Sequence, residues 1–288
     1  MLLLGASGFF GPVLAAQLGR DLLAQTYRNR PIAGGIRFDA ATSSIREIVN
    51  GLKPRPATAV VLFAETGIDA CAADPVATAK INVEAAVRAI RELSDLKVVP
   101  VFSSSDAVFD GARSYWKEKD DVRPILTYGR QKLEVEKFMT TLRSPWLVVR
   151  LPKMDSIITE WISNFESGKQ IRCATDNFFT VAAASDVARA ITMLIRDRAQ
   201  GLYHLGGPER LSRRELLQVV FDEYCKFDTP KAEIVECSLR DFGVPEVRPL
   251  DTSMSSDKFT SRYGPMIRPS SEIARLAVRT HFEKKSKA

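Results

Sequence analysis

The sequence predicts an α/β protein that is built on a doubly wound parallel sheet, with a smaller lobe in its second half. Short apolar runs alternate with longer amphipathic stretches, the pattern expected when crossover helices join parallel strands. The apolar runs are continuous, as expected for strands that are covered on both faces of a sheet. Both observations favour a parallel sheet between two layers of helices.

The elements of the first half follow from these runs in chain order. Apolar residues recur at helical spacing between the runs, which predicts helices there. The expected strands are 1–4, 59–63, 98–102 and 146–151, and the expected helices are 12–23, 75–93 and 128–142.

After residue 150 the alternation loosens. Helices are expected at 155–166 and 185–196, and a strand at 201–205. Ser212 and Glu215 have the spacing of a capping box, which predicts a helix that runs to about residue 224. We therefore expect residues 1–150 to form one domain to which 178–206 return. Residues 151–177 and 207–288 then form an interleaved C-terminal lobe.

Composition excludes several classes of protein. Of 288 residues, 45% are hydrophobic and 26% are charged, as in ordinary globular proteins. The net charge of +6 comes from 41 basic and 35 acidic residues that are interspersed, so no nucleic-acid partner is expected. The basic tail 283–287 is interpreted as a solvated terminus. The modest positive charge favours anionic small ligands such as dinucleotides and nucleotide sugars.

Cysteine and histidine usage argues against metal and hydrolase chemistry. The four cysteines lie far apart without metal-ligand spacing, so reduced thiols and no metal site are expected. Two histidines exclude a multi-histidine metal site and leave few candidates for a Ser/His triad. The first residues lack a basic region and a long apolar run, and no later run has membrane-spanning length. A cytoplasmic protein without a membrane partner is expected.

A glycine-rich turn follows the first apolar run and precedes the first helix. It reads Gly5-Ala6-Ser7-Gly8-Phe9-Phe10-Gly11. Glycines allow a tight turn with exposed N–H groups, and a helix N-terminus favours an anion. The turn therefore predicts a pyrophosphate site, with a purely structural turn as the alternative.

The spacing Gly-x-x-Gly-x-x-Gly is that of short-chain dehydrogenases, and it points to a Rossmann-type fold. Where the next strand should end, Arg28 and Arg30 stand in place of an acidic residue that would bind a ribose 2′-hydroxyl. Arginines there favour a 2′-phosphate, and hence NADP(H) over NAD(H). A solvated loop is the alternative for these two residues.

Tyr128 and Lys132 have the i, i+4 spacing that places both on one face of a helix. The ammonium is expected to lower the pKa of the phenol toward the range useful for acid catalysis. The pair alone has low specificity and often forms only a surface contact. Upstream, an apolar strand ends in three serines, and Ser105 is expected to stabilise an oxyanion, whereas Ser103 and Ser104 cap a loop.

The glycine turn, the Ser105-x-x-Val-Phe segment and Tyr128-x-x-x-Lys132 together resemble the extended short-chain dehydrogenase/reductase superfamily. Within it, Ser104-Ser105-Asp106-Ala107-Val108-Phe109-Asp110-Gly111 resembles the S-T-D-x-V-F-D-G signature of the dTDP-4-dehydrorhamnose reductase branch. The resemblance covers the first half closely. It extends loosely to the rest through 203–207 and 248–253.

The resemblance implies a function and a set of site residues. It implies reduction of the C4 ketone of a 4-keto-6-deoxy nucleotide sugar, with Tyr128 as proton donor, Ser105 on the same oxygen and Lys132 on the ribose hydroxyls. The cofactor would be bound by Gly5, Ser7, Gly8, Phe9, Phe10, Gly11, Arg28, Arg30, Asp39, Ala64, Tyr128, Lys132 and Pro152. The substrate would be bound by Ser105, Asp106, Phe109 and Arg248.

Two other functions remain possible interpretations of the sequence, and the sequence departs from the pattern of the family at three places. The alternatives are a nucleotide-sugar epimerase or dehydratase that retains NAD, and a non-catalytic NADP-binding regulatory subunit. The first strand begins almost at Met1, Glu65 follows Ala64 where the branch keeps a small residue, and the loop 112–122 is individual. Superfamily members often pair through helices beside the active site, so a homodimer is a further expectation.

Overall fold

The computed structural model describes residues 1–287 and divides them into two compact units. The first unit contains residues 1–108, 123–150 and 188–203. The second contains residues 109–122, 151–187 and those from 204 onward. The range expected to return to the first domain, 178–206, is thus divided, because 178–187 and 204–206 belong to the second unit.

A seven-stranded sheet forms the centre of the first unit, in the order β10-β6-β5-β4-β1-β2-β3. Parallel pairing places Leu3 beside Val60 and Val60 beside Val101. The connection reverses direction beside β1, as in doubly wound folds, so the predicted fold class is confirmed. The strands are β1 (Leu2–Leu4), β2 (Ala24–Tyr27), β3 (Ile36–Arg37), β4 (Thr58–Val61), β5 (Val99–Ser105), β6 (Leu147–Leu151) and β10 (Gly201–His204).

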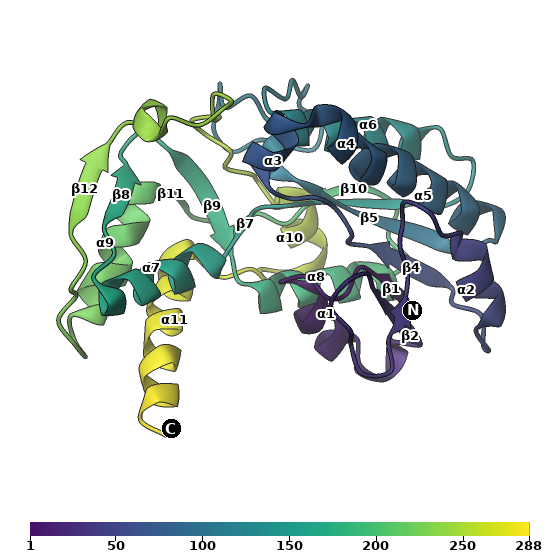
Figure 1. Cartoon of the computed structure of the whole chain (residues 1–288), viewed down its shortest axis with the longest axis horizontal. Helices are drawn as coiled ribbons and strands as arrows, with labels where there is room; N and C mark the ends of the chain where they lie inside the picture. The colour runs from purple at the N-terminus through teal and green to yellow at the C-terminus, as the bar shows by residue number, and fades with distance from the viewer. Residues whose placement is uncertain (288) are drawn as a thin grey trace. The chain divides into compact units, whose positions relative to one another are not determined.

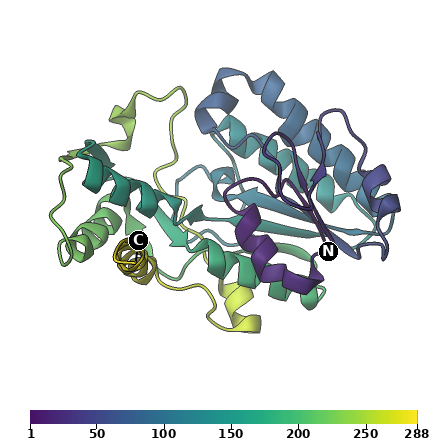
Figure 2. The ribbon, with the colours of Figure 1, turned by 60° about the horizontal axis from the view of Figure 1, so that its bottom comes forward.

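Helices cover both faces of this sheet. In Figures 1 and 2, α5 and α6 lie over one face, and α1 and α8 lie over the other. The longer helices are α1 (Gly11–Leu18), α2 (Ile45–Gly51), α5 (Ala86–Asp95), α6 (Thr127–Thr140) and α8 (Ala184–Arg196). The shorter elements are η1 (Gly19–Asp21), α3 (Ile68–Ala73), α4 (Pro75–Ala79), the π-helix η2 (Lys80–Ala85) and η3 (Asp106–Val108).

Two expected helices of the first unit differ in the structure. The helix expected at 12–23 ends at Leu18, because Gly19 has φ +52° and the chain then turns into a short 3-10 segment. The helix expected at 75–93 is interrupted by the π-helix and continues as α5 to Asp95. The apolar side of α5 still packs into the core through Ile90 and Leu93.

The second unit has its own core between short strands and helices. Trp161, Phe165 and Tyr224 are buried in this core. Its strands are β7 (Lys153–Met154), β9 (Phe178–Ala182) and β11 (Arg210–Ser212) in one sheet and β8 (Ile171–Ala174) and β12 (Ile234–Cys237) in another. Its helices are α7 (Ser156–Ser167), α9 (Arg213–Tyr224), η4 (Leu239–Phe242), α10 (Asp257–Tyr263) and α11 (Ser270–Lys285).

The predicted capping box opens α9 as expected. The Ser212 hydroxyl accepts from the backbone N–H of Glu215 at 3.0 Å, and the Glu215 carboxylate accepts from the N–H of Ser212 at 2.7 Å. Two orphan donors of the first helical turn are thereby satisfied. None of the helices within residues 1–287 is long and apolar enough to cross a membrane.

Candidate functional site

The glycine-rich turn joins β1 to α1 in a compact conformation that requires glycine at its first position. Gly5 has φ +82°, and a Cβ there would lie 2.7 Å from the backbone nitrogen of Phe63. Only glycine fits both conditions. The Gly5 N–H donates to Thr26 Oγ1 at 3.0 Å, and the Ala6 N–H donates to the Thr26 carbonyl at 2.8 Å, which ties the turn to β2.

The next part of the turn leaves room for a ligand. A Cβ at Gly8 would meet no atom within 4 Å, and Phe9 is 58% exposed. Ser7 is half-buried, whereas Phe10 and Gly11 are buried at the start of α1. No side-chain hydrogen bond caps this helix, so no protein side chain occupies the positive end of its dipole. These features fit a pyrophosphate against the turn.

The residues expected at the adenosine end lie after β2 and β3. Arg28 and Arg30 are exposed, and Arg28 Nε lies 3.3 Å from Asp39 Oδ2. Asp39 also accepts from the N–H of Ala41 at 3.0 Å. The sequence predicted both arginines and Asp39 as cofactor residues but not that Arg28 and Asp39 pair with each other. Arg28 therefore faces the competing attraction of a carboxylate.

The three serines at the end of β5 have different partners. Ser103 Oγ donates to the Val61 carbonyl at 2.9 Å, and Ser104 Oγ donates to Glu136 Oε1. Ser105 is half-buried; its hydroxyl donates to Asp106 Oδ1 at 3.0 Å and accepts from the Ala107 N–H at 3.2 Å. Ser103 and Ser104 fix the strand, whereas Ser105 stands at its exposed end beside Asp106.

Tyr128 and Lys132 lie one turn apart on the buried face of α6. Tyr128 is 9% exposed and Lys132 is 3% exposed. Lys132 Nζ donates to the Ser103 carbonyl at 2.9 Å and lies 5.6 Å from the centre of the Tyr128 ring. The phenol packs in a cluster with Cys71, Ala107 and Leu126. The ammonium and the phenol are therefore neighbours at the carboxyl end of β5.

The prediction that Lys132 lowers the pKa of Tyr128 is wrong for the chain without ligands. Burial raises the pKa of Tyr128 above its usual value, and the neighbouring Asp106, Cys71 and Glu65 raise it further. Burial also lowers the pKa of Lys132 to about 8, opposed by Glu136 and Cys71. Desolvation outweighs the attraction between ammonium and phenolate, so the phenol stays protonated at neutral pH.

Gly129, directly after Tyr128 in α6, is a packing position beside the candidate site that the sequence motifs did not single out. A Cβ at Gly129 would lie 1.9 Å from the Ala107 carbonyl oxygen. Only a glycine lets α6 rest against the backbone that follows Ser105. The Tyr-Gly pair at the start of the helix was the available signal, because a glycine inside a helix usually marks a close approach.

A buried amide network under the segment after β4 was also missed. Asn82, in the π-helix, accepts from the Glu65 N–H at 2.8 Å and donates to the Glu65 carbonyl at 2.9 Å. Asn82 Nδ2 also donates to Gln131 Oε1 at 2.7 Å, and Gln131 donates to the Pro75 carbonyl at 3.1 Å. This network fixes the backbone of Glu65, next to half-buried Ala64, relative to α6. The π-helix is a frequent sign of a functional segment.

Phe109, Pro152 and Arg248 belong to the second unit. Phe109 is fully buried; its ring stacks on Trp116 with centroids 4.8 Å apart and meets the His204 ring edge-on. Its side chain therefore packs in a core. Pro152 is buried between β6 and β7, and Arg248 is half-buried in the segment before residue 249. Their expected ligand roles stay predictions.

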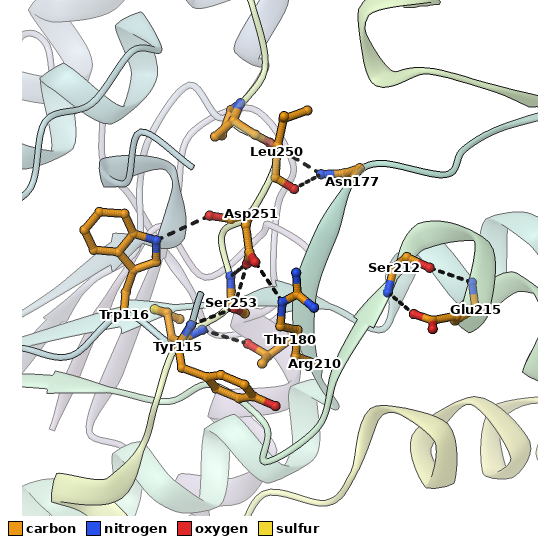
Figure 3. A network of polar contacts seen from close by, with 12 residues as sticks. Tyr115, Trp116, Asn177, Thr180, Arg210, Ser212, Glu215, Leu250, Asp251 and Ser253 are labelled. Atoms are coloured by element: carbon orange, nitrogen blue, oxygen red, sulfur yellow. Dashed lines mark hydrogen bonds and ion pairs between the residues drawn. The ribbon is translucent and has the colours of Figure 1, made fainter. Parts of the chain in front are cut away.

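A polar network in the second unit holds the loop 112–122, as Figure 3 shows. Asp251 Oδ2 accepts from Arg210 Nε at 2.7 Å, and its Oδ1 accepts from the Ser253 hydroxyl at 2.6 Å. The Asp251 carbonyl accepts from Trp116 Nε1 at 3.3 Å, and Ser253 Oγ accepts from the Tyr115 N–H at 2.9 Å. The individual loop is thus fixed by named contacts within its own unit.

Within residues 1–287, no group of three or more His, Cys, Asp or Glu side chains lies close enough together to hold a metal ion.

Comparison with known proteins places the chain among reductases and their relatives. It is 26% identical to a dTDP-4-dehydrorhamnose reductase of Sinorhizobium fredii, over 90% of both chains. It is 24% identical to the methionine adenosyltransferase 2 subunit beta of Bos taurus, over 78% of this chain and 72% of that protein.

A solved structure has the same fold. The dTDP-4-dehydrorhamnose reductase of Bacillus anthracis in complex with NADP superposes with a TM-score of 0.80, at 19% identity over 96% of both chains. The family model described as the RmlD substrate binding domain matches residues 1–280. The expected class, an NAD(P)-dependent oxidoreductase of the extended short-chain dehydrogenase/reductase type, agrees with this match. The chain belongs to the family of this RmlD substrate binding domain.

Proposed function

We propose that this chain is an NADPH-dependent reductase that acts on the keto group of a nucleotide sugar, such as a dTDP-4-keto-6-deoxysugar. The observation that carries the proposal is the buried Tyr128 and Lys132 pair on α6, whose ammonium donates to the Ser103 carbonyl near the end of β5. Membership of a family with dTDP-4-dehydrorhamnose reductases supports it. A phenol that is held near a strand end can protonate a substrate oxygen.

The first unit offers a place for the cofactor. The glycine turn and the uncapped start of α1 would hold the pyrophosphate, and Arg28 and Arg30 would bind a 2′-phosphate. Lys132 would bind the ribose hydroxyls of the nicotinamide half. When bound, NADPH supplies the hydride that reduces the carbonyl carbon.

The residues of the chain would supply the proton and stabilise the developing charge. The raised pKa of the Tyr128 phenol, which comes first from burial, keeps it protonated, and this is the form that a ketone reduction consumes. Tyr128 would donate its proton to the carbonyl oxygen as that oxygen gains negative charge. The Ser105 hydroxyl, which donates to Asp106 Oδ1 in the chain alone, would turn to donate its hydrogen bond to the same oxygen. The charge of Lys132 would then stabilise the phenolate that remains.

A titration and a turnover assay test the proposal together. NADPH and NADH would be titrated separately by fluorescence, followed by incubation with a panel of keto and non-keto nucleotide sugars. We expect tighter binding of NADPH and one NADPH oxidised for each hydroxyl formed. Purified protein that carries NAD and rearranges nucleotide sugars without consuming NADPH would instead indicate an epimerase or dehydratase.

A second candidate is a non-catalytic NADP-binding subunit. The observation that favours it is the similarity to the methionine adenosyltransferase 2 subunit beta, which is a subunit by its name. This candidate predicts cofactor binding without turnover of any keto-sugar in the panel. The presence of Ser105 and Tyr128 favours the reductase, because cofactor binding through the ribose needs Lys132 but needs no proton donor.

A further inference from the structure

The buried face of α6 carries a third ionisable side chain beyond Tyr128 and Lys132. Glu136 follows Lys132 at i+4, so the two lie one turn apart on the same face. Glu136 is only 6% exposed. The other carboxylate nearby in sequence, Glu134, is exposed on a different side of the helix. The helix therefore presents a phenol, an ammonium and a carboxylate in one buried row.

Two neighbouring strands hold the Glu136 carboxylate in a fixed position. Arg150, in β6, donates from Nε to Oε1 at 3.0 Å and from Nη2 to Oε2 at 2.7 Å. This is the two-pronged geometry that gives arginine and carboxylate pairs their orientation. Ser104, in β5, donates its hydroxyl to Oε1. The side chains of Arg150 and Glu136 are 4% and 8% exposed, so the pair is shielded from water.

The stability of the fold does not by itself explain why Arg150 and Glu136 form a buried ion pair. Taking two charges out of water costs several kcal/mol per ion, and apolar residues of similar size often serve a core equally well. The pair lies next to a buried ammonium, whose charge is itself disfavoured by burial. A fixed carboxylate at this place would lower the free energy of the charged form of Lys132.

Few groups around Lys132 can stabilise its charged form. Its ammonium lies over the Phe102 ring at 4.7 Å and donates to the Ser103 carbonyl, both in β5. From α6 it is faced by Tyr128 and Glu136, and from α3 by the Cys71 thiol. Arg150 lies beyond Glu136. Burial lowers the pKa of Lys132 to about 8, and Glu136 is named before Cys71 among the groups that oppose this.

We propose that Glu136, held by Arg150 and Ser104, is a positioning residue that keeps Lys132 charged and thereby sets the upper pH limit of the reaction. The inference rests on the proposed function for its link to turnover. Its link to the ionisation of Lys132 is independent of that function. Glu136 touches neither substrate nor cofactor in this assignment and acts through Lys132.

The test compares Glu136→Gln with wild type and with the matched control Glu134→Gln. The ionisation of Lys132 is followed by NMR of protein with ¹³C-labelled lysine, and its signal is assigned with Lys132→Arg. The glutamine keeps the shape and an acceptor oxygen but removes the charge. We expect the Lys132 midpoint to move down by about one pH unit or more in Glu136→Gln. It should stay in place in Glu134→Gln, and Glu136→Asp should restore most of it.

The pH profile of kcat/KM for keto-sugar reduction provides the second readout. Its alkaline limb should move down by the same amount in Glu136→Gln, while the rate at pH 6 stays within a few-fold of wild type. A purely structural role would instead lower the rate at every pH without moving the limb. An unchanged Lys132 midpoint in folded Glu136→Gln protein overturns the proposal.

Two arrangements keep the test decisive. If Glu136→Gln does not fold because Arg150 is left unpaired, Glu136→Gln combined with Arg150→Met removes both charges. A smaller shift in the same downward direction is then expected, because loss of the Arg150 cation offsets part of the effect. An unmoved midpoint in that variant also overturns the proposal. If wild type reduces no keto-sugar, the proposed function fails, but the NMR midpoint still decides the role of Glu136.

Discussion

Each of the two units contains a buried carboxylate that binds both an arginine and a serine, but the two clusters have different surroundings. Glu136 pairs with Arg150, whose side chain is 4% exposed, and lies one turn from the ammonium of Lys132. Asp251 pairs with Arg210, whose side chain is 28% exposed and lies 3.8 Å over the Phe178 ring. The first cluster adjoins another ionisable group, whereas the second joins separate loops (Figure 3).

The role of each buried arginine and carboxylate pair therefore depends on the polar or charged group that lies beside the carboxylate. Around Asp251, the remaining acceptor and donor positions are filled by Ser253 and by the indole of Trp116. The result is a fixed loop. Around Glu136, the next group is an ammonium whose charge is disfavoured by burial. The result is electrostatic control of a candidate catalytic side chain.

The largest effect is expected on turnover, when a tyrosine of the first unit and a tyrosine in the loop of the second unit are each replaced by phenylalanine. Tyr128→Phe removes the proton donor and should lower kcat for keto-sugar reduction by about 10²–10⁴. NADPH affinity, measured by fluorescence titration, should hardly change. The matched control is Tyr115→Phe, since Tyr115 is exposed and its network contact uses the backbone N–H. Equal losses in both variants would contradict the division of roles.

Stability should also differ between the two clusters. Glu136→Ala leaves the guanidinium of Arg150 buried without its carboxylate and should cost about 3–5 kcal/mol of unfolding free energy. Asp251→Ala should cost less, about 1–3 kcal/mol, because the partly exposed Arg210 can bind water instead. Urea unfolding of both variants at pH 7 measures the difference. A larger loss of unfolding free energy in Asp251→Ala than in Glu136→Ala would mean that fixing the loop stabilises the fold more than the buried pair does.

The buried ammonium predicts a pH dependence with a definite sign. The pKa of Lys132 is lowered by burial from 10.5 to about 8, so the unfolded chain binds more protons between these values. The cost of burying the charge is therefore fully present below pH 8 and is relieved as the pH rises toward 10.5. Unfolding of wild type and Lys132→Met at pH 7 and pH 9.5 checks this. The stability advantage of Lys132→Met should shrink at the higher pH, and a constant advantage would contradict it.

The smallest effect concerns the choice of cofactor. Arg28→Ser removes an exposed guanidinium and should reduce the preference for NADPH over NADH by roughly tenfold, the lower end for a charge-assisted hydrogen bond. Arg46→Ser is the control, because Arg46 is also an exposed arginine paired with an aspartate, Asp95. The ratio of the two dissociation constants is the measurement. An unchanged ratio in Arg28→Ser would assign the 2′-phosphate to other residues.

Much of the fold could be predicted because local patterns determined it. Continuous apolar runs marked β5 and β6, and the spacing of Ser212 and Glu215 marked the start of α9. The placement of β9 could not be predicted in this way. It pairs with β11, thirty or so residues later, and nothing within 178–182 specifies that partner.

The candidate site was predictable in its residues but not in its electrostatics. The motifs located Ser105, Tyr128 and Lys132, because spacing and strand ends depend on local sequence. The direction of the Tyr128 pKa shift depends on burial and on Asp106, Cys71 and Glu65, which come from other segments. The partners of Glu136 likewise come from β5 and β6. Its i+4 spacing from Lys132 was visible, but its burial was not.

The π-helix between α4 and α5 interrupts a long helical segment with a stretch of wider turns. Its wider turns accommodate an additional residue, which directs Asn82 toward Glu65 while Ile90 and Leu93 still reach the core. Deleting one residue here would restore a regular helix. The apolar stripe of α5 would keep its phase, because the wider turns already accommodate the additional residue, but Asn82 would lose the position from which it accepts from the Glu65 N–H. A one-residue deletion between residues 80 and 85 should therefore affect the backbone of Glu65, which Asn82 holds, more than the packing of α5.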